Sequence, residues 1–270
     1  MKIHDARRLL EGIRDANYHH DGIRCLRLLR LDAARFAALR TEIQHLCAQQ
    51  VPSDVRNTRH VTNWAGPFGK VTQYSLYNAT GRFDDFSSDH NASCFGKRFH
   101  HKVNFPELDG LMRTLPALIN CRLNLMGPSA GLSMHEEHSV IKAQSGLVGI
   151  RARFHLPIVT NPLAEISLDG SVYHLEAGSI FFINHGCVHS AVNSGTATRI
   201  HLVWDLLLTR AACNLLFGDM ADACPGHTIR VPSSQRCVTP VRTTAISNAR
   251  VLPSSLSEPE AADLAFLRVQ

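Results

Sequence analysis

Long apolar runs are absent from this 270-residue sequence. No stretch approaches the roughly 18 consecutive apolar residues that a membrane-spanning helix needs, and the first residues hold no apolar segment of the secretory type. Paired cysteines are also missing, because the eight cysteines form no C-x-x-C motif and no regular spacing. We therefore expect a cytoplasmic protein with reduced thiols, without a membrane span, a zinc knuckle or a secreted disulfide framework.

A clustered stripe of positive charge is also lacking. The 28 Lys and Arg residues outnumber the 23 Asp and Glu residues, yet they are scattered along the chain. A nucleic-acid surface gathers its cations on one face or along one helix, so nucleic acid is not the expected partner. The chain has no internal repeat and no low-complexity segment, while its 16 histidines are numerous for this length.

Short β-type runs dominate the middle of the chain, from residue 116 to 208, where Gly, Pro, Asn and Asp separate them. Many short strands at close spacing predict an all-β sandwich or barrel. Asp169 and Gly170 between two such runs predict a tight hairpin turn, because both residues tolerate positive φ. The expected strands are residues 121–126, 147–159, 165–168, 172–175, 179–184 and 199–208.

The flanking regions differ from this core. The first 50 residues are helix-rich by pattern, and residues 31–46 form the clearest helix, with Asp32 as its cap. Residues 51–115 are polar and irregular, apart from short strand-like runs such as 71–77. We predict an N-terminal helical and loop-rich region (1–115) packing on the core, a core (116–208), and a C-terminal helix and tail (209–270).

Two histidines and a glutamate in the β-rich segment have the spacing of a metal site. His135 and Glu137 are two residues apart and would share one face of a strand, while His189 can arrive from a facing strand. Two imidazoles and one carboxylate form the facial triad that holds non-haem Fe(II) and leaves positions open for a cosubstrate and O₂. An H-x-E motif alone also fits a solvated turn, and Glu136 with His138 offers a second frame on the opposite face.

Arg199 begins an apolar run ten residues after His189. An unpaired guanidinium would be costly there, and its planar fork suits the distal carboxylate of 2-oxoglutarate. Arg153 and His155 repeat the Arg-x-His spacing of Arg199 and His201, which places a cation and an imidazole on one face of each of two strands. Either pair alone could face solvent. The residues that would then form the buried face are Phe154, Leu156, Ile200 and Leu202.

Taken together, these strings resemble the aspartyl/asparaginyl β-hydroxylase family of Fe(II)/2-oxoglutarate oxygenases, and within it the bacterial proline cis-4-hydroxylase type. The resemblance covers residues 116–207. It implies a mainly β protein with a double-stranded β-helix (jelly-roll, cupin-like) core and N-terminal and C-terminal helical additions. It also implies that His135 and His189 bind iron, that Arg199 binds the 5-carboxylate of 2-oxoglutarate, and that Arg153 with His155 lines the cosubstrate site. The strings that carry it are residues 135–137, 150–161, 176–184, 189–193 and 199–205.

Three features depart from the family pattern. The proline-hydroxylase type carries H-x-D and the mammalian β-hydroxylase type lacks the acid, whereas here the longer Glu137 occupies the ligand position. The segment between His135 and Arg153 is longer than in either type, and residues 142–146 are expected to form a loop over the site. Residues 1–115 match no family that we can name.

The sequence thus predicts an Fe(II)- and 2-oxoglutarate-dependent dioxygenase that uses O₂ to hydroxylate an unactivated carbon of an amino acid or peptidyl substrate in natural-product tailoring. Desaturation or cyclisation with the same cofactors stays open, while halogenation is disfavoured because a halide needs the coordination position of Glu137. A non-catalytic cupin-like binding module is the alternative of another class. Both signs of charge for a substrate occur in the 80–102 region, in Arg82, Lys97, Arg98, His100, Asp84, Asp85 and Asp89.

Overall fold

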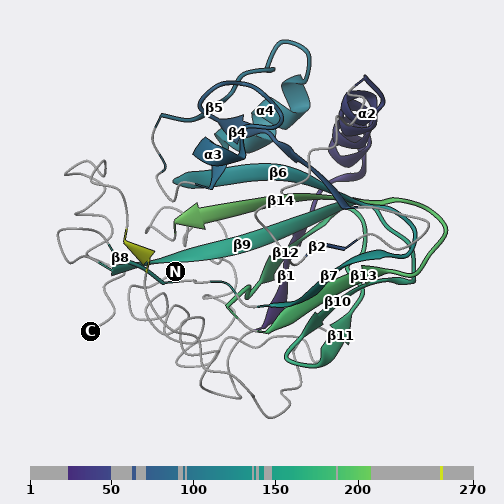
Figure 1. Ribbon diagram of the computed structural model, residues 1–270. Coiled ribbons are helices and arrows are strands. Elements are labelled where there is room, and N and C mark those ends of the chain that lie inside the picture. Colours follow the sequence, from purple (N-terminus) through teal and green to yellow (C-terminus); the bar gives the residue numbers. More distant parts are fainter. Residues whose placement is uncertain are drawn as a thin grey trace, which may run out of the picture.

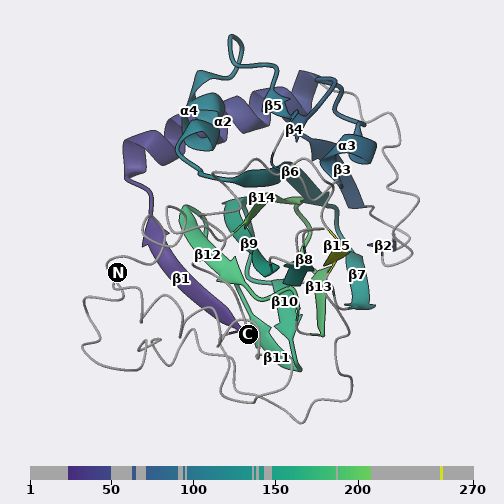
Figure 2. The same ribbon diagram turned by 90° about the vertical axis from the view of Figure 1, so that its left-hand side faces the viewer.

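Two antiparallel β-sheets that face one another form the framework of the protein (Figures 1 and 2). The computed structural model describes residues 24–49, 63–64, 71–90, 94, 96–135, 137, 140–142, 148–186, 188–207 and 250–251. Within this part the chain is mainly β, and the predicted jelly-roll class is confirmed. None of the described helices is long and apolar enough to cross a membrane.

The larger sheet has eight strands, and its main path runs in the order β1-β12-β9-β14-β6-β3. A short parallel pair, β8 and β15, extends it from β9. Strand β14 has an almost uninterrupted buried pattern, because one face packs on the helices and the other faces the interior. The strands are β1 (Cys25–Arg30), β3 (Val71–Ser75), β6 (Leu118–Met126), β8 (Val140–Lys142), β9 (Val148–Val159), β12 (Ser179–Ile183), β14 (Arg199–Leu207) and β15 (Arg250–Val251).

The smaller sheet has five strands in the order β11-β10-β13-β7-β2 and faces the larger one across the interior (Figure 2). A separate two-stranded ribbon lies beside the helices in Figure 1. The strands of the smaller sheet are β2 (Asn63–Trp64), β7 (Ala130–His135), β10 (Ala164–Leu168), β11 (Ser171–Tyr173) and β13 (His189–Asn193), and the ribbon pairs β4 (Tyr77–Asn78) with β5 (Arg98–Phe99).

Helices α2 (Ala33–Gln49) and α4 (Pro106–Arg113) lie on the outer face of the larger sheet, while the short α3 (Phe86–Asp89) lies near β4 and β6 (Figure 1). The main apolar core lies between these two helices and the sheet, and a second cluster lies between the two sheets. Burial of apolar surface in the first cluster supplies the main driving force that holds the helices on the barrel. Its central side chains are Leu39, Ile43, Leu108, Phe154, Leu202 and Trp204.

Local predictions are confirmed where their signals are strong. Asp32 caps α2 by accepting a hydrogen bond from the Arg35 backbone N–H at 2.9 Å. Asp169 and Gly170 both have positive φ, 46° and 82°, and connect β10 to β11. The four apolar neighbours of the Arg-x-His pairs, residues 154, 156, 200 and 202, belong to the main core.

The N-terminal region differs from its prediction. Residues 25–30 form β1, which pairs with β12, although the first 50 residues were expected to be helix-rich. Short segments of alternating Leu and Arg fit either period, and pairing with the edge of the larger sheet decides in favour of a strand. Together with β3, this strand makes the N-terminal region part of the larger sheet. The predicted C-terminal helix and the frame of Glu136 and His138 lie outside the described residues. Of the loop predicted for residues 142–146, Lys142 is the last residue of β8, and the rest also lies outside them.

Candidate metal and cosubstrate site

His135 and His189 face each other across one strand pair of the smaller sheet. They are register partners on β7 and β13, and their ring centroids lie 4.2 Å apart. His189 therefore arrives from the neighbouring strand of the same sheet, which corrects the expectation of a facing strand. The His135 ring bonds through Nδ1 to the Ser133 carbonyl at 2.7 Å. Because a carbonyl can only accept, Nδ1 carries the hydrogen and Nε2 presents its lone pair to the site.

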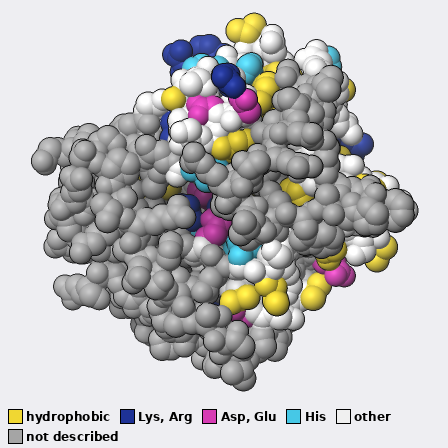
Figure 3. Space-filling view, viewed as in Figure 1, with side chains coloured by type: hydrophobic (Ala, Val, Ile, Leu, Met, Phe, Trp, Pro, Cys, Tyr) yellow, Lys and Arg dark blue, Asp and Glu magenta, His cyan; other side chains and the backbone are white. Residues whose placement is uncertain are grey.

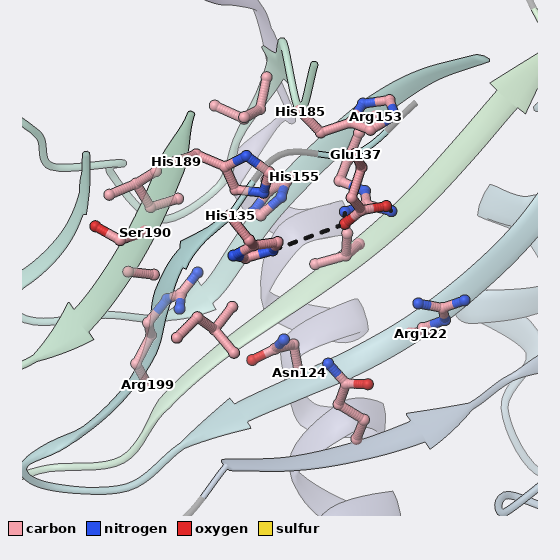
Figure 4. A pocket seen from close by; sticks show the side chains of 16 residues that line it. Arg122, Asn124, His135, Glu137, Arg153, His155, His185, His189, Ser190 and Arg199 are labelled. Atoms are coloured by element: carbon pink, nitrogen blue, oxygen red, sulfur yellow. Dashed lines mark hydrogen bonds and ion pairs between the residues drawn. The ribbon is translucent and has the colours of Figure 1, made fainter. Parts of the chain in front are cut away.

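Glu137 completes the cluster directly after β7. Its backbone N–H donates to the His185 carbonyl at 3.0 Å, and its Oε1 lies 4.0 Å from His135 Nε2 (Figure 4). The ligand atoms of the two histidines and Glu137 all lie within 4.8 Å of one another. Two imidazoles and one carboxylate at this spacing fit the ligand preferences of Fe(II).

Two arginines of β9 donate hydrogen bonds to the Glu137 carboxylate. Arg151 and Arg153 each donate from Nη2 to Oε2 at 3.0 Å, and Arg153 Nη1 also bonds to Oε1. Arg153 in turn pairs with Asp205 of β14 through Nε and Nη2 at 2.8 and 3.0 Å. Burial would raise the pKa of Glu137, but the guanidinium groups of Arg153 and Arg151 hold it well below its usual value. Glu137 is thus an anion when the site is free of metal.

Arg199 is buried at the start of β14 without a carboxylate partner among the described residues. Its donors reach His201 Nδ1 at 2.6 Å and the Met126 sulfur at 3.7 Å. Burial without a compensating charge lowers the pKa of Arg199 to about 9. An anion that entered the cavity would offset this cost, which is the behaviour expected of a carboxylate-binding arginine.

His155 and His201 connect the two Arg-x-His segments inside the barrel. Their Nδ1 atoms lie 3.3 Å apart, and since His201 Nδ1 already accepts from Arg199, the shared hydrogen belongs to His155. Burial, and then the neighbouring guanidinium groups, hold the pKa of His155 well below 6.5. For His201 the same lowering comes from burial, Arg199 and His155. Both rings are neutral at neutral pH.

These groups line one cavity between the two sheets. In Figure 3 acidic, basic and histidine side chains lie together in a hollow of the face shown there. Figure 4 shows that the two histidines and Glu137 lie on one side, with Arg199, Asn124 and Arg122 around them. The structure therefore brings together all of the predicted site residues, namely His135, Glu137, His189, Arg153, His155 and Arg199.

The substrate candidates of the 80–102 region do not line this cavity. Asp89 is fully buried and pairs with Arg122 of β6, so it holds a cavity-lining arginine in place without facing the cavity itself. Lys97 donates to the Ile119 carbonyl at 2.7 Å, and burial lowers its pKa to about 8. The exposed candidates Arg82 and Asp84 pair with each other. Of the remaining candidates, Asp85 caps α3, and Arg98 and His100 line a separate cavity.

Arg151 and Arg122 are two residues at the candidate site that sequence reasoning missed. Each lies two residues before a residue that faces the cavity, Arg153 or Asn124, and strand alternation could have placed it on the same face. The partner of each is far along the chain. Glu137 and His185 contact Arg151, and Asp89 pairs with Arg122.

A sequence model described as aspartyl/asparaginyl beta-hydroxylase matches residues 34–208. The chain belongs to this family. The resemblance predicted for residues 116–207 is confirmed, and the match also covers residues 34–115, for which no family was predicted. L-proline cis-3-hydroxylase 1 of a Streptomyces species is 44% identical over 54 residues, which span 20% of this chain and 19% of that protein. The aligned part is thus about a fifth of that relative's length.

Solved structures of related architecture are similar at a low level. A prolyl-4-hydroxylase of Pseudomonas putida has a TM-score of 0.37 and 14% identity, over 73% of this chain and 98% of that one. HygX of Streptomyces hygroscopicus, solved with nickel, 2-oxoglutarate and hygromycin B, has a TM-score of 0.38 and 8% identity, over 73% and 87%. The family assignment rests on the sequence match and not on these weak similarities.

Proposed function

We propose that this protein is an Fe(II)- and 2-oxoglutarate-dependent dioxygenase that hydroxylates an unactivated carbon of an amino acid or amino-acid-derived substrate. One observation carries the proposal: His135, Glu137 and His189 converge beside a buried Arg199 that has no carboxylate partner in the described part. A metal triad and a free anion receptor in one cavity are the two requirements for binding a chelating dicarboxylate. Family membership supports the same activity.

The chain's own residues hold and orient the reactants. His135, Glu137 and His189 would hold the iron, and Arg199 would receive the distal carboxylate of 2-oxoglutarate. When bound, iron and 2-oxoglutarate supply the activation of O₂ that inserts one oxygen atom into the substrate and releases succinate and CO₂. Arg153 holds Glu137 and Asp205 together, and the neutral His155 keeps a lone pair on Nε2 at the cavity wall.

A polar strip on β3 and β6 is the proposed contact for the substrate. Gln73 and Asn124 are direct cross-strand partners, and their side-chain oxygens are buried without a hydrogen-bond partner in the described part of the chain. Arg122 lies on the same face as Asn124 and is fixed by Asp89. A free amino acid offers a carboxylate for Arg122 and N–H donors for the two amide oxygens, since unmet buried acceptors cost free energy.

The test is turnover of a defined panel. Protein loaded with Fe(II) is incubated with 2-oxoglutarate and free amino acids, L-proline first, because the partial relative is named for it. Short peptides and N-acetylated amino acids form the comparison set, and succinate and substrate mass are followed. Succinate coupled to a 16 Da gain is expected with a free amino acid, and the His189→Ala protein serves as the control. A coupled loss of 2 Da would redirect the proposal to desaturation or cyclisation.

Absence of iron binding and of succinate formation would leave the non-catalytic cupin-like module as the remaining function. Iron content therefore decides between the enzyme and the binding protein before any substrate is known. The cytoplasmic location and the role in natural-product tailoring stay predictions.

A further inference from the structure

The length of Glu137 raises a question about the number of open positions at the metal. The triad leaves three adjacent positions when the carboxylate binds through one oxygen, two for 2-oxoglutarate and one for O₂. A glutamate that chelated through both oxygens would occupy one of these positions. The site therefore needs a hydrogen-bonding partner that keeps the second oxygen of Glu137 away from the metal.

The arginine contacts divide the two oxygens of Glu137. Oε2 accepts from Nη2 of both Arg151 and Arg153 at 3.0 Å, so its lone pairs are engaged. Oε1 accepts from Arg153 alone and is the oxygen that lies 4.0 Å from His135 Nε2. Oε1 thus keeps a lone pair for a metal beside the His135 imidazole.

Arg151 is held in place from its other side. Its side chain is 6% exposed, and its Nε and Nη2 contact His185 Nε2 at 3.3 and 3.1 Å. The His185 carbonyl in turn accepts the Glu137 backbone N–H. Arg151, His185 and Glu137 thus form a closed loop of contacts, in which the guanidinium is fixed independently of the carboxylate.

We propose that Arg151 is a positioning residue that retains Oε2 and makes Glu137 a ligand through Oε1 only. This inference rests on the proposed function. It gives Arg151 a role that a shorter Asp in the ligand position would not require, and so links Arg151 to the departure from the family pattern at Glu137. A simple charge effect would differ, because removing a cation near a dication would tighten metal binding without weakening 2-oxoglutarate.

The experiment uses the full chain loaded with Co(II). Unlike Fe(II), Co(II) can be handled in air, and its absorption bands in the visible range report on the ligands. We compare wild type, Arg151→Met, Glu137→Asp and the double variant, and measure Co(II) affinity, 2-oxoglutarate affinity and the Co(II) absorption bands. Arg151→Met is expected to bind Co(II) at least as tightly and 2-oxoglutarate about tenfold more weakly, in the range typical of residues that orient metal ligands. In the Glu137→Asp background the same change should alter 2-oxoglutarate affinity less than about twofold, a small fraction of the effect expected for such a residue.

Unchanged 2-oxoglutarate affinity and an unchanged Co(II) spectrum in Arg151→Met would overturn the inference, and so would an equal effect in the Glu137→Asp background. Should Arg151→Met not fold, His185→Phe removes a second anchor of the guanidinium and is expected to change affinity in the same direction, by less. Wild-type protein that binds neither Co(II) nor 2-oxoglutarate would instead refute the proposed function. The two failures are therefore distinguishable.

Discussion

His135 on β7 and His189 on β13 are direct partners in one antiparallel strand pair, with ring centroids 4.2 Å apart. The register of a single pair of strands thus sets the distance between two proposed metal ligands. A slip by one residue would turn His189 to the opposite face of the sheet, because side chains alternate along a strand. Ladder pairing on both sides of β13 opposes such a slip, since β10 pairs with it as well.

Loss of either imidazole should abolish metal binding. His135→Ala and His189→Ala are each expected to bind less than a tenth of the Fe(II) or Co(II) held by wild type, because two remaining ligands hold a divalent ion poorly. Metal content after desalting is the measurement. His174→Ala is the matched control, since His174 contacts the Ala164 carbonyl and lies outside the cavity lining. Full metal content in His189→Ala would remove this histidine from the site.

Arg199 should show opposite effects on function and stability. Arg199→Met removes the receptor for the distal carboxylate, and loss of a charged contact of about 2–5 kcal/mol should abolish measurable 2-oxoglutarate binding. The same change removes a buried cation whose pKa burial lowers to about 9, so the apo protein should melt at the same temperature or higher. Arg199→Lys keeps the charge but not the fork, and is expected to bind with intermediate affinity. Calorimetry with 2-oxoglutarate and thermal melting test both halves.

The site residues on strands were predictable because period and spacing are local properties. His135 with Glu137, and Arg199 with His201, lie two residues apart and share a face wherever the chain is extended. The alternation of polar and apolar residues in β9 and β14 then fixes which face is the interior. Apolar neighbours such as Phe154 and Leu202 are buried in the main core, so the arginines and histidines between them point to the other face of the sheet.

Partners that are distant in sequence could not be predicted in this way. Arg122 is 33 residues from Asp89, and the local sequence of α3 gives no indication that its last residue faces a strand of the barrel. For Asp89 the charged loop suggested a substrate contact, but burial against Arg122 and Ser75 makes it a support. β1 shows the same limit, because pairing with the edge of a sheet outweighed a weak helical pattern.

Arg122 should affect substrate binding and leave the cosubstrate unaffected. Arg122→Gln is expected to raise the KM for the amino acid substrate by about tenfold or more, since a charged hydrogen bond contributes roughly 1.5–3 kcal/mol. The KM for 2-oxoglutarate should stay within about twofold, because the distal carboxylate is assigned to Arg199 and not to Arg122. Arg98→Gln is the control, as Arg98 lies in the separate cavity. Equal changes in both KM values would place Arg122 in the cosubstrate site.

The apo protein should lose stability as the pH falls below about 6.5. Burial, followed by nearby charged groups, holds the pKa values of His155, His185 and His201 well below 6.5 in the folded state. The unfolded chain therefore binds more protons than the folded chain below this pH, so the free energy of unfolding falls as the pH falls. With about 1.4 kcal/mol per pH unit for each group, the limiting slope for three histidines is about 4 kcal/mol per unit. Glu137, whose pKa is lowered, adds to the loss only at more acidic pH, near the ordinary carboxyl pKa and below.

Urea unfolding of metal-free protein between pH 7.5 and 5.5 measures this slope. His201→Gln should reduce the slope by about the contribution of one histidine, while keeping an acceptor for Arg199. A flat profile over this range would show that these imidazoles take up protons in the folded protein as readily as in the unfolded chain.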